Sequence, residues 1–136
     1  MNKTSRSVLL LFAFGVFLIF FLSWKANPNL KETPFIPEWL SNWADYSHNN
    51  QRRTGVPFMG LGLLAGIYFI YSKRTAPVNW IFAWLILGIV VCMAEVGQYF
   101  IPARSLDMKD VFWGGLGAGI GLLFPYFAWL LIRMLK

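Results

Sequence analysis

The sequence is poor in charged residues. Of its 136 residues, only 13% are Asp, Glu, Lys or Arg, whereas 57% are hydrophobic and 18% are aromatic. A soluble globular domain carries about 25% charged residues, so this composition excludes an ordinary soluble protein. The single cysteine, Cys92, excludes an intrachain disulfide, and the single histidine, His48, gives little support to a metal site. The net charge of +6 comes from basic residues that flank apolar runs, so we expect no nucleic-acid partner.

Four apolar runs are long enough, or nearly long enough, to cross about 30 Å of hydrocarbon as helices. They cover residues 8–24, 55–72, 78–101 and 111–135. We therefore predict an all-α membrane protein, a bundle of four transmembrane helices that forms a single domain over residues 1–136. The first run follows Lys3 and Arg6, as an uncleaved signal anchor would.

The basic residues bear on the orientation of the bundle in a bacterial cytoplasmic (inner) membrane. They divide evenly between the two sides, so the positive-inside rule alone does not decide the orientation. The signal-anchor-like start favours both termini in the cytoplasm. All the acidic residues also belong to the opposite side, which carries the loop of residues 25–54. We therefore predict that this loop is external.

The external loop, residues 25–54, is the longest polar segment. Its prolines exclude one continuous helix, but after Pro37 the side chains of Trp39, Trp43 and Tyr46 recur at near-helical spacing. We predict a short amphipathic helix with Pro37 in its first turn, lying in the membrane interface where aromatic rings sit at headgroup depth. A platform on which a ligand stacks is the alternative.

Glycines recur along two of the apolar runs. The second run contains Gly60, Gly62 and Gly66, and the fourth contains the pairs Gly115/Gly119 and Gly117/Gly121. Small residues let helix backbones approach closely in a membrane, so we expect internal packing of the bundle. A homo-oligomer, or docking on another membrane protein, is the alternative. The glycines do not form a nucleotide-binding loop, because no strand precedes them and no Lys-Ser/Thr pair ends them.

Polar residues gather where the third run ends, in the stretch EVGQYFIPARSLDMKD at residues 95–110. Glu95 and Gln98 are three residues apart and share a helix face, and Pro102 ends that helix. Arg104 follows and can fold back toward Glu95. A carboxylate near the centre of a membrane helix costs about 2.5 to 3.5 kcal/mol, so an acid in such a run is a functional candidate.

Two aspartates follow the arginine. Asp107 and Asp110 fit the beginning of the fourth helix as its N-cap and as a first-turn acid. One interpretation is structural: Glu95 and Arg104 pair so that a tight hairpin can insert, and the aspartates only cap a helix. A buried ion pair often adds little net stability, so we favour a ligand-binding role for Glu95, Gln98 and Arg104, with Asp107 and Asp110 beside them.

The stretch AEVGQYFIPARSLDMKDVFWGGLGAGIG, residues 94–121, resembles the VanZ-like family of small bacterial membrane proteins, which is named for a determinant of resistance to the glycopeptide teicoplanin. The family pattern falls on Glu95, Gln98, Pro102, Arg104, Asp110, Gly117 and Gly121. Two positions depart from it. Gly114 stands where many members have asparagine, and Thr54 stands where many have His or Asn. If those two polar groups belong to one site in the family, the resemblance implies that the site of this member is altered.

We therefore predict a membrane module that binds an anionic, lipid-linked or cell-envelope molecule at the outer leaflet. Arg104 would contact the phosphate or carboxylate, and Arg52 and Arg53 could join it from the preceding loop. The resemblance extends this prediction to an effect on glycopeptide tolerance.

Two other functions are kept as alternatives. One is an intramembrane hydrolase in which Glu95, Asp107 and Asp110 hold a divalent metal. The other is an accessory subunit of a membrane complex. Catalysis is the less favoured function because the sequence offers no convincing nucleophile, and we assign no metal ligand and no cofactor.

Overall fold

The computed structural model describes residues 3–49, 52–102 and 104–135, and the side chain of His48 lies outside this described part. Four long helices run through the chain: α1 (Lys3–Ser23), α3 (Arg52–Tyr71), α4 (Pro77–Gln98) and α5 (Met108–Met134). Between α1 and α3 lie the short helix α2 (Glu38–Ala44) and two 3-10 turns, η1 (Leu30–Glu32) and η2 (Ser47–Asn49). Within the described ranges there is no strand. The prediction of an all-α protein with four long helices is confirmed.

The helix ends differ from the apolar runs by a few residues. Helix α1 begins at Lys3, before the apolar run, because backbone hydrogen bonds do not require apolar side chains. Helix α4 ends at Gln98, and the residues that follow form a turn before Pro102, since the residue that precedes a proline is disfavoured in α conformation. Pro37 is the N-cap of α2 and not a residue of its first turn.

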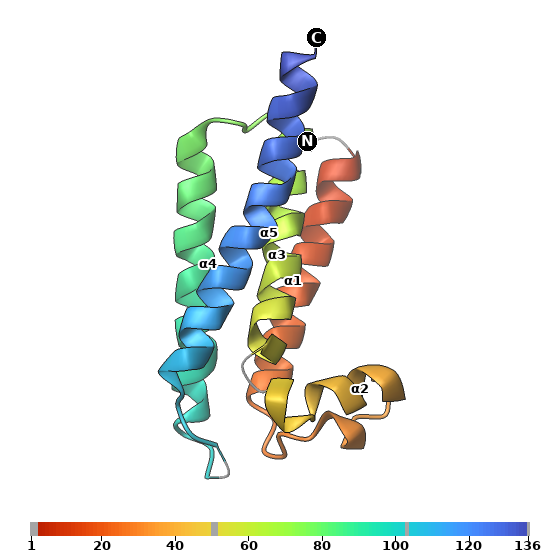
Figure 1. The fold of residues 1–136 in the computed structure, drawn as a ribbon, viewed down its shortest axis with the longest axis vertical. Helices are drawn as coiled ribbons and strands as arrows, with labels where there is room; N and C mark the ends of the chain where they lie inside the picture. The colour runs from red at the N-terminus through yellow and green to blue at the C-terminus, as the bar shows by residue number, and fades with distance from the viewer. Residues whose placement is uncertain (1–2, 50–51, 103, 136) are drawn as a thin grey trace.

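The four helices stand side by side, with both chain ends at one end of the bundle (Figure 1). The short helix α2 and the connection between α4 and α5 lie at the opposite end. Helix α3 makes its most extensive contact with α5 and also packs against α1 and α4. Glu95 and Gln98 at the end of α4 therefore lie at the same end of the bundle as α2.

The crossing of α3 and α5 depends on glycine. Gly62 of α3 faces the carbonyl of Ala118, Gly117 of α5 faces the carbonyl of Gly55, and a Cβ atom at either glycine would collide with that backbone. Such close approach is how membrane helices gain packing contacts without help from water. The prediction of internal packing is confirmed for Gly62, Gly66, Gly117 and Gly121. It was wrong for Gly60 and Gly115, where a Cβ atom would meet no other atom within 4 Å because these positions lie away from the helix crossing.

The bundle is apolar both inside and outside. Buried core side chains include Phe58, Leu61, Leu87, Val91 and Leu122. Large apolar side chains also cover the outward faces of all four long helices. All four are long and apolar enough to cross a membrane. Outward apolar faces of this extent are stable in hydrocarbon and not in water.

Candidate functional site

The end of α4 holds a buried polar pair. Glu95 and Gln98 face the bundle interior with only 3% and 8% of their surfaces exposed. The Gln98 Nε2 donates a hydrogen bond to Glu95 Oε1 over 2.8 Å. The other carboxyl oxygen, Oε2, is buried and has no hydrogen-bond partner among the described residues. A buried acceptor without a partner costs about 1 to 3 kcal/mol, so this oxygen needs an explanation.

The beginning of α5 faces this pair. The Asp107 side chain caps the helix by accepting a hydrogen bond from the Lys109 backbone N–H over 2.9 Å, and Asp110 lies in the first turn. Both predicted positions are confirmed. The Glu95 carboxyl is close enough to feel the backbone N–H of Asp107 and the charge of Asp110. The positive end of the α5 dipole therefore attracts Glu95, while Asp110 repels it.

Arg104 is fixed by the end of α1. Its Nη2 donates to the Leu22 carbonyl over 3.1 Å, and its Nε donates to the Lys25 carbonyl over 3.2 Å. The last carbonyls of a helix lack partners within the helix and form the negative end of its dipole, which makes them good acceptors for a guanidinium. Arg104 thus ties the α4–α5 connection to α1.

The expected folding back of Arg104 onto Glu95 is not what the structure has. The side-chain hydrogen bonds of Arg104 go to the carbonyls of Leu22 in α1 and of Lys25 just beyond it, and across the described ranges no ion pair joins Arg104 to Glu95. The two groups interact through space without contact, because the Glu95 charge still acts on Arg104. The unsatisfied α1 carbonyls compete for the guanidinium, and the sequence around Arg104 gives no sign of them.

The two arginines that begin α3 differ in position. Arg53 is half-buried and its charge acts on both Arg104 and Asp110, whereas Arg52 is exposed. Burial lowers the pKa of the Arg104 guanidinium from its ordinary value, and the positive charge of Arg53 lowers it further. Arginine still stays protonated in proteins, so two cationic groups approach one another here. We call the group of Glu95, Gln98, Arg104, Arg53 and Asp110 the polar cluster.

The carboxylates do not gather around one point. No group of three His, Cys, Asp or Glu side chains in the described part of the chain is placed to hold a metal ion. Asp107 is exposed and already accepts the N-cap hydrogen bond, while Glu95 is buried. The hydrolase alternative needs Glu95, Asp107 and Asp110 on one ion, and this arrangement does not supply such a site.

An apolar layer closes the polar cluster toward the middle of the bundle. Gly114 is buried, and a Cβ atom there would meet the side chain of Val91, one turn below Glu95, with Phe58 close behind. An asparagine at this position would have to displace Val91. The departure from the family pattern at Gly114 therefore coincides with apolar packing directly beneath Glu95. At the other departure, Thr54 is half-buried in the first turn of α3.

Trp24 at the end of α1 is a neighbour that the sequence did not identify as part of the site. Its indole N–H donates to the Ala94 carbonyl over 3.2 Å, and its ring covers Gly97. This contact brings α1 against α4 directly beside Glu95. The sequence offers one indication of this contact, a glycine at position 97. Because Gly97 has no Cβ atom, the large Trp24 ring can lie directly against the α4 backbone.

The connection between α1 and α3 has its own hydrogen-bonded structure. The Asp45 carboxylate accepts from the backbone N–H groups of Leu30 and Lys31 over 3.0 to 3.1 Å. Lys25 Nζ donates to Thr33 Oγ1 over 2.9 Å. Lys25 therefore anchors the loop with its side chain and holds Arg104 with its carbonyl.

The predicted aromatic face of the loop helix is only partly formed. Helix α2 ends at Ala44, so Tyr46 lies beyond it. Trp39 and Tyr46 are exposed, Trp43 is half-buried, and the buried residues of α2 are Ser41 and Ala44. The expectation of one continuous helical face through Tyr46 was wrong because the Asp45 carboxylate bonds back to η1 as the helix ends.

Four long apolar helices with outward apolar faces and a polar cluster at one end define a multi-pass membrane protein. A family model described as VanZ/LLP1 matches residues 7–132, and the chain belongs to this family. Neither a curated protein nor a solved structure matches the chain significantly.

Proposed function

We propose that this protein binds the anionic head group of a lipid-linked or cell-envelope molecule at the outer leaflet of the bacterial inner membrane, without breaking a bond. The observation that carries the proposal is the way in which the Arg104 guanidinium is held by backbone carbonyls. The carbonyls of Leu22 and Lys25 hold the guanidinium in place through two of its five N–H groups, and among the described residues no ion pair ties it to Glu95 or Asp110, although both charges act on it. A fixed, half-buried guanidinium is well suited to a phosphate or carboxylate.

Arg53 supports the same ligand class. Its positive charge acts on Arg104, and although Glu95 and Asp110 offset part of this effect, two neighbouring guanidinium groups repel each other. An anion between them would relieve this repulsion. The exposed Arg52 has no such role and takes no part in the proposed site.

Glu95 and Gln98 add a second requirement on the chemistry of the ligand. The unpartnered Oε2 of Glu95 accepts hydrogen bonds, so a ligand that presents a hydroxyl group beside its anionic group would satisfy it. A sugar phosphate or a partly protonated phosphate has this combination. Sequestering such an envelope precursor would alter its exposure at the cell surface, which connects the proposal to glycopeptide tolerance.

The accessory-subunit alternative is less favoured by the packing. Gly117 and Gly121, the glycines that would dock a partner helix, are already buried against α3. The polar cluster, by contrast, contains the buried Glu95 Oε2, which has no hydrogen-bond partner among the described residues.

Binding by the head group is tested by native mass spectrometry of the purified protein with lipids that share a chain and differ in head group. Phosphatidic acid and polyprenyl phosphate should both bind more tightly than diacylglycerol and polyprenol. Arg104→Gln should weaken the binding of both phosphates about tenfold, roughly 1.4 kcal/mol. The matched control Arg52→Gln should leave binding unchanged. Equal binding of charged and neutral lipids, or equal effects of the two substitutions, would contradict the proposal.

The outer location is tested by cysteine labelling in intact cells, on a Cys92→Ala background. An impermeant maleimide should label Ser47→Cys, in the loop beside the polar cluster, and should reach Ala76→Cys only after lysis. Both positions are exposed, so access to the side chain itself does not differ. The reverse labelling pattern would place the polar cluster on the cytoplasmic side and exclude an outer-leaflet ligand.

A further inference from the structure

The polar cluster carries as much negative charge as positive charge. Arg53 and Arg104 supply two guanidinium groups, and Glu95 and Asp110 supply two carboxyl groups. The charges of Arg53 and Arg104 act on Asp110, and the charge of Asp110 acts on Glu95. A ligand that carried negative charge alone would therefore be attracted by the arginines and repelled by Asp110.

Helix packing places the two carboxyl groups near one another. A Cβ atom at Gly114 of α5 would meet the side chain of Val91 on α4, so the two helices lie close together there. From this contact, Asp110 is four residues back along α5 and Glu95 is four residues on along α4, about one helical turn in each case. Because α4 and α5 run in opposite directions, both steps lead toward the same end of the bundle (Figure 1). The two carboxyl groups therefore lie one turn beyond the same contact.

Arg53 is placed by the packing of α3 on α5. A Cβ atom at Gly55 of α3 would come close to the Trp113 carbonyl of α5. Arg53 lies two residues before Gly55, and Asp110 lies three residues before Trp113, in helices that begin at the same end of the bundle (Figure 1). Both side chains are half-buried. This packing brings Arg53 and Asp110 to the same level of the bundle, in agreement with the action of the Arg53 charge on Asp110.

The opposite charges in the polar cluster do not pair with one another. Among the described residues, neither Glu95 nor Asp110 forms an ion pair with an arginine, and the Asp110 carboxylate accepts no hydrogen bond. The Arg104 guanidinium is held instead by carbonyls at the end of α1. Glu95 Oε2 is buried and has no hydrogen-bond partner within the same part of the chain. Both carboxyl groups thus keep acceptor oxygens that a ligand can use.

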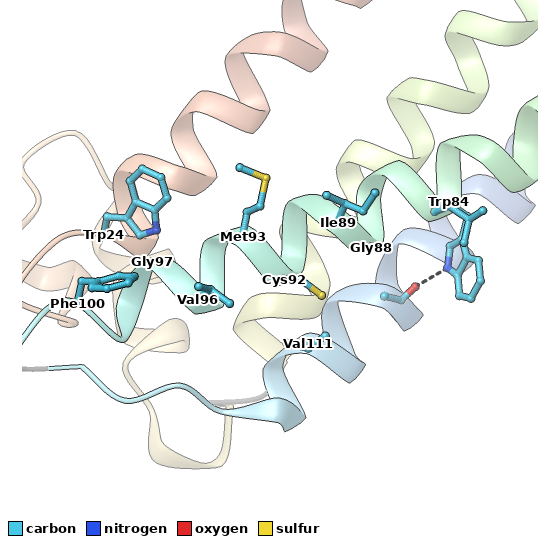
Figure 2. A pocket seen from close by; sticks show the side chains of 12 residues that line it. Trp24, Trp84, Gly88, Ile89, Cys92, Met93, Val96, Gly97, Phe100 and Val111 are labelled. Carbon is cyan, nitrogen blue, oxygen red and sulfur yellow. Dashed lines mark hydrogen bonds between the residues drawn. The ribbon is translucent and has the colours of Figure 1, made fainter.

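The outward face of α4 offers no charged group to a ligand. An apolar groove of about 750 Å³ runs along this face, from Trp24 and Phe100 at one end to Trp84 at the other (Figure 2). None of the described residues that line it is charged. We therefore expect the charged atoms of a head group to bind in the polar cluster and not on this face.

A primary ammonium group fits both carboxyl groups. It donates up to three N–H groups and carries a positive charge, whereas an ionised carboxylate only accepts. Hydrogen bonds to charged groups are roughly twice as strong as those between neutral groups. A hydroxyl group could satisfy Glu95 Oε2 but would bring no positive charge to Asp110. A quaternary ammonium group would bring the charge but no N–H donor.

We infer that Asp110 makes the polar cluster selective for a zwitterionic head group of the phosphoethanolamine class, in which a short linker joins a phosphate to a primary ammonium. Arg104 and Arg53 hold the phosphate. Asp110 accepts from the ammonium, and Glu95 Oε2 is its second acceptor. The inference rests on the proposed function for the phosphate and adds the ammonium as a second element of recognition. Because the charges of the polar cluster cancel, a ligand whose own charges cancel leaves the site neutral.

The inference is tested with three phospholipids that share acyl chains and a phosphodiester and differ only in the group beyond it. Phosphatidylethanolamine carries a primary ammonium, phosphatidylglycerol carries hydroxyl groups, and phosphatidylcholine carries a quaternary ammonium. Binding to the purified protein is measured by native mass spectrometry. Phosphatidylethanolamine should bind about tenfold more tightly than either of the others, which corresponds to roughly 1.4 kcal/mol.

Asp110→Asn should remove this preference, because the amide has no negative charge and its nitrogen is a donor that opposes the ammonium. Binding of phosphatidylethanolamine should fall about tenfold, and binding of phosphatidylglycerol should stay the same or rise. Asp107→Asn is the matched control. It removes the same charge at an exposed side chain that caps α5, and asparagine caps a helix as well as aspartate does. This variant should retain the preference.

Other results would overturn the inference. Equal binding of the three lipids by the unaltered protein would exclude it without recourse to any variant, and the proposed function would remain if Arg104→Gln weakened all three alike. Equal loss of the preference in Asp110→Asn and Asp107→Asn would also exclude it, because the beginning of α5 would then act through its total charge. A preference that depends on Asp110, with binding indifferent to Arg104→Gln, would instead contradict the proposed function.

Discussion

Two regions of the bundle use the same helices in opposite ways. At the crossing of α3 and α5, glycines meet backbone directly, and Gly62, Gly117 and Gly121 are buried. At the polar cluster a few residues away, a buried carboxyl oxygen of Glu95 has no hydrogen-bond partner within the described part of the chain, and the charged groups Arg104 and Arg53 stand near each other. The crossing is tightly packed, whereas the polar cluster contains a buried acceptor that makes no hydrogen bond with the described residues.

The difference separates residues that stabilise the fold from residues that are available to bind a ligand. Close packing at the crossing would be disturbed by a single added carbon atom. The polar cluster costs stability, and residues that cost stability persist where they serve a function. Substitutions at the crossing should therefore change stability, and substitutions at the polar cluster should change ligand binding.

The largest effect is expected at the crossing. A Cβ atom at Gly121 would collide with the Met59 backbone carbonyl, which cannot move away without shifting α3. Gly121→Ala should lower the free energy of unfolding by about 1 to 3 kcal/mol, the usual range for overpacking. Thermal unfolding in detergent, followed by circular dichroism, measures the change.

Gly60→Ala is the matched control for this prediction. A Cβ atom at Gly60 meets nothing, and alanine is favoured over glycine in a helix by about 0.5 to 1 kcal/mol. This variant should be as stable as the unaltered protein or more so. If both alanine variants behave alike, the crossing does not hold the bundle in the way its geometry indicates.

A smaller effect, of opposite sign, is expected at the polar cluster. Glu95→Gln removes a buried ionisable carboxyl whose Oε2 has no partner among the described residues, while Gln98 can still donate to the remaining side-chain oxygen. The free energy of unfolding should stay the same or rise by up to about 1 kcal/mol. Binding of polyprenyl phosphate should fall about tenfold. Native mass spectrometry and thermal unfolding on the same samples measure both quantities.

Gln98→Leu provides the contrast. It removes the hydrogen bond that Gln98 Nε2 donates to the Glu95 carboxyl and should destabilise the protein by about 1 to 3 kcal/mol, because a buried acceptor loses this partner. Should Glu95→Gln destabilise as much as Gln98→Leu and bind lipid normally, the carboxyl would be structural. That outcome would restore the interpretation of these residues as parts of an insertable hairpin.

Much of the fold follows from the sequence because a membrane simplifies the problem. Length and apolarity suffice to locate the four long helices, since every backbone group in hydrocarbon must be satisfied within a helix. The cap at Asp107 and the first-turn acid at Asp110 follow from local rules for helix ends. Glycine spacing was also informative, because the α3–α5 contact depends on it.

The partner of Arg104 could not be predicted in the same way. Its acceptors at Leu22 and Lys25 are about 80 residues distant along the chain, and they are backbone carbonyls that any residue type supplies. The contact between Trp24 and Ala94 has the same character. Side-chain patterns reveal which polar groups need partners, but a partner provided by the end of a distant helix leaves no mark in the pattern.

The smallest effect on stability is expected in α2, at the exposed side chain of Trp39. Trp39 is 72% exposed, so Trp39→Cys on a Cys92→Ala background should change the free energy of unfolding by no more than about 0.5 kcal/mol. A nitroxide attached there should nevertheless lie at headgroup depth, because large amphipathic rings such as Trp39 and the nearby Tyr46 gain by lying in the interface. Accessibility to oxygen and to a water-soluble nickel complex, measured by electron paramagnetic resonance in vesicles, gives the depth.

A label at Ser47, which is also exposed, should report water by the same measurement. If the label at residue 39 also reports water, α2 projects away from the membrane and its aromatic rings become available for a ligand, as the alternative to an interfacial helix requires.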